Sequence, residues 1–94
     1  MKAILHVCFL GEDAAGKRFR QDYAGKAVDL PFAPFVGMEM ECRAWKGTRE
    51  VKSVRLDVDE LCVHIEMGLE KRTTREDYEG MIESYEIDGW KLKV

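Results

Sequence analysis

The sequence predicts an α+β fold: a curved antiparallel sheet of five or six strands, with a small barrel as one form it can take, and one helix near the C-terminus. Three observations lead to this prediction. The chain has 94 residues, enough for a single core and one domain over residues 1–94. Short alternating segments follow one another with turn residues between them, which is typical of antiparallel hairpins. Only residues 74–87 carry an apolar stripe at helical spacing.

The first predicted strand covers residues 2–10, where apolar side chains fall on both faces. Such a pattern is typical of a strand that is at least partly covered on both sides. A polar turn from Gly11 to Gly16 follows. Residues 17–30 fit either a returning strand or a short helix around Phe19 and Tyr23. The strand is favoured, because Gly16 and Gly25 would shorten any helix in this part of the chain.

A meander is expected next, with strands over residues 38–45, 51–58 and 61–67. Residues 46–48 supply the first turn, and Asp59 with Glu60 supplies the second. Alternation in residues 51–58 places Val54, Leu56 and Val58 on one face of that strand and Ser53, Arg55 and Asp57 on the other. In the next strand, the residues predicted to face the core are Leu61, Val63, Ile65 and Met67.

The predicted helix spans residues 74–87, and a capping box can begin it at Thr73 with Glu76 or at Thr74 with Asp77. Its apolar stripe consists of Tyr78, Met81, Ile82 and Tyr85. Mid-helix Gly80 costs about 1 kcal/mol relative to alanine and suggests a close approach by a neighbouring element. Gly89 is placed to end the helix, and residues 90–94 alternate as a last strand.

The charge balance argues against nucleic acid as a partner. The net charge is −3, with the excess of acidic groups in residues 48–94. An acidic chain lacks the field that attracts phosphates. The segment from Lys17 to Tyr23, which interleaves basic and aromatic residues, leaves a nucleic-acid accessory domain as a third hypothesis.

The three cysteines indicate a reducing compartment, since a disulfide framework normally has an even count. Residues 1–10 lack the length and cleavage site of a signal peptide, and no apolar run reaches the length of a membrane span. We therefore expect a cytoplasmic protein with no membrane partner. No glycine-rich phosphate loop, nucleophile elbow or helical histidine pair points to an enzyme.

Two mirrored triplets, His6-Val7-Cys8 and Cys62-Val63-His64, predict a possible zinc site. Residues two apart in a strand share a face, so each triplet presents one imidazole and one thiol together. If the strands paired antiparallel in the right register, Cys8 would face Cys62 and His6 would face His64. Imidazole and thiolate are ligands that zinc prefers, and Glu66 shares the face of His64. Zinc is accordingly the only cofactor that the sequence suggests. The simpler interpretation is that the four side chains are structural and buried or half-buried.

The segment 30–37 is apolar and contains two prolines, so it cannot form a central strand. It either closes one end of the core or presents an apolar patch to a partner. The interaction residues expected there are Pro31, Phe32, Pro34, Phe35 and Val36. The leading hypothesis is therefore a non-catalytic protein-interaction module that associates with itself, through this loop and an exposed sheet edge.

Overall fold

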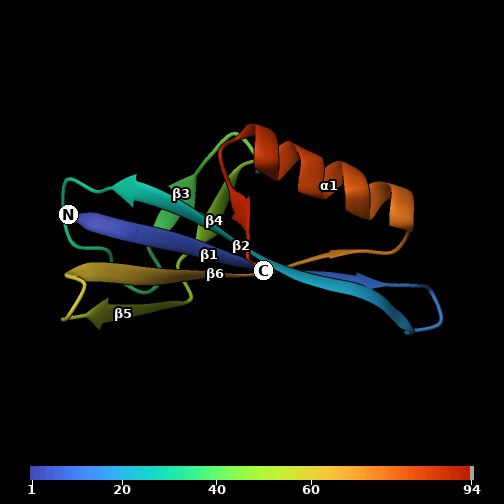
Figure 1. The fold of residues 1–94 in the computed structure, drawn as a ribbon, viewed down its shortest axis with the longest axis horizontal. Coiled ribbons are helices and arrows are strands. Elements are labelled where there is room, and N and C mark those ends of the chain that lie inside the picture. Colours follow the sequence, from blue (N-terminus) through green and yellow to red (C-terminus); the bar gives the residue numbers. More distant parts are fainter. Residues whose placement is uncertain (94) are drawn as a thin grey trace.

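The computed structural model describes residues 1–93, and Figure 1 shows how their strands and helix are arranged. In chain order the elements are β1 (Lys2–Glu12), β2 (Arg18–Asp29), β3 (Glu39–Glu41), β4 (Thr48–Glu50), β5 (Ser53–Asp57), β6 (Cys62–Arg72), α1 (Arg75–Ile87) and β7 (Lys91–Leu92). The α+β class and the C-terminal helix are confirmed. The returning strand over residues 17–30 is confirmed as β2.

The main sheet has the strand order β5-β6-β1-β2-β7, while β3 and β4 form a separate two-stranded sheet. All neighbours in the main sheet are antiparallel except β1 and β6, which run parallel. The prediction of a wholly antiparallel, curved or barrel-like sheet was therefore wrong, because the sheet is mixed and remains open. Turn residues predict pairing only between strands that are consecutive in the sequence. The pairing of β6 with β1 joins strands that are far apart in the sequence, so no local pattern predicts it.

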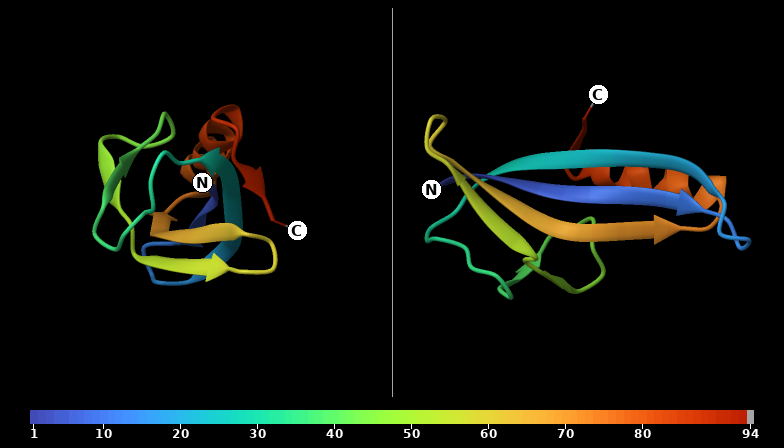
Figure 2. Two further views of the ribbon diagram at one scale, coloured as in Figure 1. Left: turned by 90° about the vertical axis from the view of Figure 1, so that its left-hand side faces the viewer. Right: turned by 90° about the horizontal axis from the view of Figure 1, so that it is seen from below.

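The core lies on one face of the main sheet. There β1 contributes Ala3, Leu5, Val7 and Phe9, all buried. Helix α1 runs along one face of the sheet (Figure 2). Its predicted stripe is buried in the core, to which the segment around β3 and β4 contributes Trp45 and Val51. The other face of β1 is half-buried, as the apolar pattern on both faces of residues 2–10 predicted.

A bulge in β6 decides which side chains enter the core beyond Met67. The pairing of β1 with β6 shifts register between His6 and Cys8, opposite Gly68, whose φ is +97°. One extra residue reverses the alternation of a strand. Leu69 therefore lies on the face of the sheet opposite the core, which is called the open face below. Glu70 is turned toward the core. Strict alternation would have placed them the other way round.

Several predicted boundaries change in the structure. The strand expected over residues 38–45 is reduced to β3, and β4 begins in the segment expected to be a turn. Thr74 caps α1, since the amide of Asp77 donates to Thr74 Oγ1 at 3.1 Å, and Gly89 with φ +90° follows the helix. The last strand is limited to β7, and the predicted position of Val94 lies outside the described residues.

Candidate functional site

The mirrored triplets lie on neighbouring strands, but in an arrangement that differs from the expected one. Because β1 and β6 are parallel, Ala3 pairs with Val63 while Cys8 pairs with Leu69. Cys62 therefore lies beside the start of β1, about 20 Å along the strands from Cys8. The expected facing of Cys8 and Cys62 was wrong. The two histidines do meet, with His6 Nε2 2.8 Å from His64 Nδ1.

The histidine pair forms a hydrogen-bonded chain across the open face of the sheet. Lys93 Nζ lies against Nδ1 of His6. A lysine ammonium only donates, so Nδ1 accepts, and the protonated Nε2 of His6 then donates to His64. Burial, assisted by the nearby charge of Lys93, lowers the pKa of His6 and favours this neutral form. Both ring nitrogens of His6 are thus occupied. Within residues 1–93 no group of three histidine, cysteine or acidic side chains is arranged to hold a metal ion.

The apolar loop, defined here as Pro31–Val36, is exposed at its tip. Phe35 is 60% exposed, and Phe32 and Val36 are exposed to similar degrees. The loop is fixed at its far end, where Gly37 N donates to Val51 O at 2.9 Å. Its aromatic rings therefore do not close over the core, and the loop presents apolar surface beside the start of β5.

The β5 edge, defined here as Lys52–Leu61, is a second apolar surface. Strand β5 is the outermost strand on one side of the main sheet. Leu56 is 59% exposed, and Val58 and Leu61 are more exposed still. The predicted core position of Leu61 was wrong, because no element covers the sheet beyond β5 in the described part of the chain. Sequence alternation gives the face of a residue but not its distance from the edge of the sheet.

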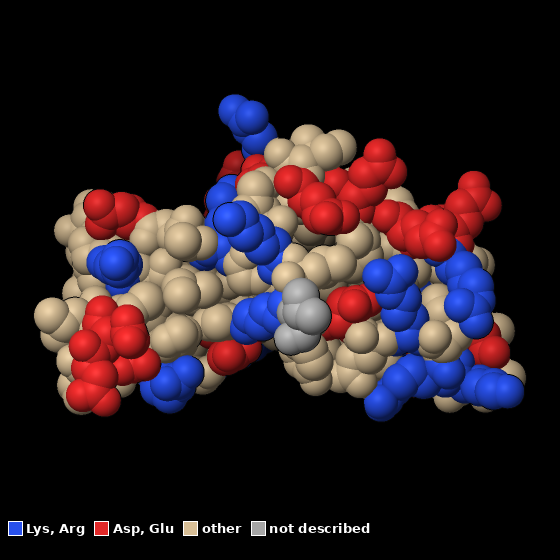
Figure 3. Space-filling view, viewed as in Figure 1, with Lys and Arg blue, Asp and Glu red and all other residues tan. Residues whose placement is uncertain are grey.

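One of the two aromatic residues of the segment Lys17–Tyr23, Phe19, packs against the core. Phe19 packs edge-on against Tyr78 with ring centroids 5.9 Å apart, and the guanidinium of Arg75 lies 5.0 Å from the Phe19 ring. Arg20 is paired with Asp22 at 2.7 Å. Basic side chains gather at this end of the β1–β2 hairpin, while acidic side chains cover α1 (Figure 3). Of this segment only Tyr23 offers an exposed ring.

Comparison of the chain with protein-family models, with curated proteins and with solved structures gave no significant match. Among the described residues, no helix is long and apolar enough to cross a membrane.

Sequence reasoning missed one buried acidic group, Glu70, which lies at the base of a cavity between α1, β6 and the β3–β4 connection. The available signal was Gly68, because a glycine inside a strand pattern often marks a bulge. A bulge there predicts that Leu69 and Glu70 exchange faces. The expected site residues thus lie apart in the structure. His6 and His64 form the histidine pair, Cys8 and Cys62 are separated along the strands, and Pro31–Val36 form the exposed apolar loop.

Proposed function

We propose that the chain is a non-catalytic interaction module that forms a two-fold symmetric homodimer by antiparallel pairing of β5 with β5 of a second copy. The observation that carries the proposal is the exposed, self-complementary edge of β5. An unpaired edge strand presents free backbone donors and acceptors to another strand. A two-fold interface requires the same patch on both copies to be complementary to itself.

The sequence of β5 meets this requirement when the symmetry axis passes through Leu56. Arg55 then lies opposite Asp57 of the second copy on one face of the strand. On the other face, Leu56 meets its own counterpart and Val54 meets Val58 of the second copy. Facing side chains in an antiparallel pair are about 5 Å apart, close enough for both ion pairs and apolar contacts.

The neighbouring registers are disfavoured by charge. An axis at Arg55 would place two arginines opposite each other, and an axis at Asp57 would place two aspartates opposite each other. Like charges facing each other across strands destabilise the pair. The axis at Leu56 is therefore the register that the side chains select.

The apolar loop extends the proposed interface. Val51 N donates to Met38 O at 2.8 Å, so the loop end lies beside the start of β5. In an antiparallel pair this end meets the β5–β6 turn of the second copy, which carries exposed Val58 and Leu61. Specific interfaces bury about 800 Å² on each partner, more than one short strand supplies. The loop and the turn together provide the additional apolar area.

The test uses two variants that each create like-charge contacts. Arg55→Glu places a glutamate opposite Asp57 of the second copy, and Asp57→Lys places a lysine opposite Arg55. We expect each variant to sediment as a monomer in analytical ultracentrifugation, under conditions where the unmodified protein is a dimer. Arg43→Glu makes the same charge change at another exposed position and is expected to leave the dimer unchanged. Circular dichroism confirms that each variant is folded.

Mixing the two variants distinguishes pairing from damage to the fold. In a mixed dimer the introduced glutamate meets the introduced lysine, and Arg55 meets Asp57, so both contacts are complementary again. Asp57 also accepts from the amides of Asp59 and Glu60, both at 3.1 Å, so Asp57→Lys weakens the turn in addition. A 1:1 mixture that recovers the dimer supports the proposed register. A monomeric unmodified protein, or a mixture that stays monomeric, would exclude it.

A further inference from the structure

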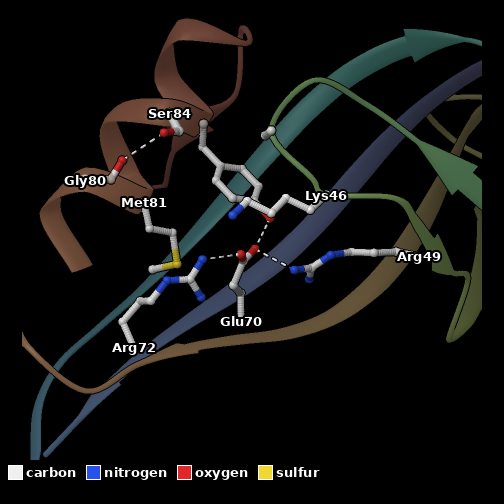
Figure 4. Close-up of a pocket in the computed structure, with 9 residues that line it drawn as sticks. Lys46, Arg49, Glu70, Arg72, Gly80, Met81 and Ser84 are labelled. Carbon is white, nitrogen blue, oxygen red and sulfur yellow. Dashed lines mark hydrogen bonds and ion pairs between the residues drawn. The ribbon is translucent and has the colours of Figure 1, made fainter. Parts of the chain in front are cut away.

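A cavity of about 470 Å³ lies between α1, β6 and the β3–β4 connection. Figure 4 shows Glu70 at its centre, with Arg72 on one side of the carboxylate and Arg49 on the other. Lys46 reaches the same cavity from the loop before β4, and Gly80 lines it from the helix. The cavity lies outside the proposed dimer interface, so a ligand could bind there independently of dimer formation.

The base of the cavity is held in a fixed geometry. Glu70 is 7% exposed, and its carboxylate lies 2.9 Å from both Arg49 Nη2 and Arg72 Nη2. The Tyr85 hydroxyl donates to the same carboxylate and accepts from Trp45 Nε1 at 2.7 Å. Burial, with the neighbouring Glu70, raises the pKa of Tyr85, so the hydroxyl stays a neutral donor. Glu70 therefore orients both guanidinium groups rather than leaving them mobile.

The cavity carries excess positive charge although the chain is acidic. Three cations, Lys46, Arg49 and Arg72, line it against the single carboxylate of Glu70. Within residues 1–93, Lys46 makes no ion pair, and Nε and Nη1 of Arg49 have no hydrogen-bond partner. A second anion can therefore bind without displacing Glu70. Guanidinium groups match the geometry of phosphate and carboxylate oxygens.

Gly80 leaves space on the helical side of the cavity. A Cβ added there meets no atom within 4 Å, so the close approach that the sequence suggested was wrong. Its φ is not positive either, so neither packing nor backbone conformation requires glycine. Glycine in a helix interior nevertheless costs about 1 kcal/mol relative to alanine. The absence of a side chain at Gly80 leaves the helical wall of the cavity open to a molecule beside the helix.

We infer that this cavity binds a phosphate group, with Arg49, Arg72 and Lys46 as its cationic ligands. A phosphate monoester carries a charge of about −2 at neutral pH, which balances the excess charge of the cavity. The cavity is several times larger than a phosphate group, so it also has room for a small organic remainder beside Gly80. The chemistry shared by inorganic phosphate and a phosphorylated small molecule is thus the phosphate dianion.

The first experiment titrates the protein with inorganic phosphate and with phenyl phosphate at low ionic strength, followed by two-dimensional NMR. We expect saturable shifts of the amides around the cavity. Lys46→Gln should weaken binding about tenfold, the effect of one lost charge-assisted hydrogen bond. Lys91→Gln removes the same charge from exposed β7 and should leave affinity unchanged. Tighter binding of phenyl phosphate would indicate a phosphorylated small molecule, and equal affinities would indicate the free anion.

A second variant fills the cavity without changing its charge. Gly80→Leu replaces a poor helix former with a good one, so the helix is retained. We expect it to abolish binding of phenyl phosphate, with Gly80→Ala showing a smaller loss. The absence of saturable shifts would overturn the inference. So would equal weakening by Lys46→Gln and Lys91→Gln, because that result indicates nonspecific attraction to the whole molecule.

Discussion

At the scale of single residues, the protonation of His6 makes the hydrogen bonds on the open face of the sheet depend on pH. Its neutral ring accepts from Lys93 and donates to His64, which lies 2.8 Å away. Burial and the charges of Lys93, His64 and Arg55 lower its pKa, whereas Glu66 acts in the opposite direction. Protonation of His6 removes the acceptor for Lys93 and places two cations side by side.

We expect the free energy of unfolding to decrease as the pH falls below about 6.5, the ordinary pKa of histidine. In that range the unfolded chain binds a proton at His6 while the folded chain does not, so stability rises with pH. The decrease continues until the pH reaches the lowered pKa of the folded state. Urea unfolding between pH 5 and 8 measures the effect. His6→Gln should flatten the profile, and an unchanged profile in that variant would contradict this role.

Glu70 is buried because of a bulge two residues earlier in the same strand. The bulge at Gly68, with φ +97°, turns Glu70 inward and Leu69 outward. The burial of a carboxylate is costly unless it is paired and hydrogen-bonded. Arg49, Arg72 and Tyr85 supply those partners from three different elements. The same group thus joins β4, β6 and α1 and forms the base of the cavity.

At the scale of elements, α1 depends on its N-cap for a defined start. The sequence allowed a capping box from Thr73 or from Thr74. The structure selects Thr74, whose hydroxyl accepts from the amide of Asp77 at 3.1 Å. Its backbone is extended, as an N-cap requires.

Thr74→Ala should destabilise the protein by about 1 kcal/mol, because one amide of the first helical turn loses its acceptor. Thr73→Ala is the matched control, since it removes the same atoms one residue earlier, and it should have little effect. Thermal or urea unfolding compares the two variants directly. Equal destabilisation by both substitutions would show that the cap is not specific to Thr74.

At the scale of the whole molecule, the exposed apolar residues concentrate on two neighbouring surfaces. The apolar loop carries Phe32, Phe35 and Val36, and the β5 edge carries Leu56, Val58 and Leu61. Both surfaces come together at β5 because Val51 joins the loop end to the start of that strand. Because the two surfaces adjoin, they can form one continuous patch in the proposed dimer interface.

Phe35→Asp should shift the proposed dimer toward monomer while the domain stays folded, because the ring is 60% exposed and leaves the core intact. Native mass spectrometry measures the subunit number. Ile87→Asp makes the same kind of change on the exposed end of α1 and should retain the dimer. A folded Phe35→Asp variant with unchanged mass would remove the loop from the interface.

Local sequence patterns predicted the apolar loop and singled out the two histidines, whereas the arrangement of these residues depends on the pairing of distant strands. The apolar loop was predicted from two prolines among aromatic residues, and the histidines were singled out by their triplets. The parallel pairing of β1 with β6 brought His6 to His64 and separated Cys8 from Cys62. The exposure of Leu56 and Leu61 depends on their place at the sheet edge, and the burial of Glu70 depends on a bulge.

The sequence by itself determined the α+β class, the helix with its apolar stripe, the long strands β1 and β2, and the apolar character of residues 31–36. These features depend on side-chain periodicity and turn chemistry within a few neighbouring residues. Only the tertiary structure decided that β6 pairs with β1 in parallel, that β5 lies at an open edge, and that three cations line one cavity with Glu70. Those features arise from contacts between distant segments, whose free energy depends on the packing of the whole chain.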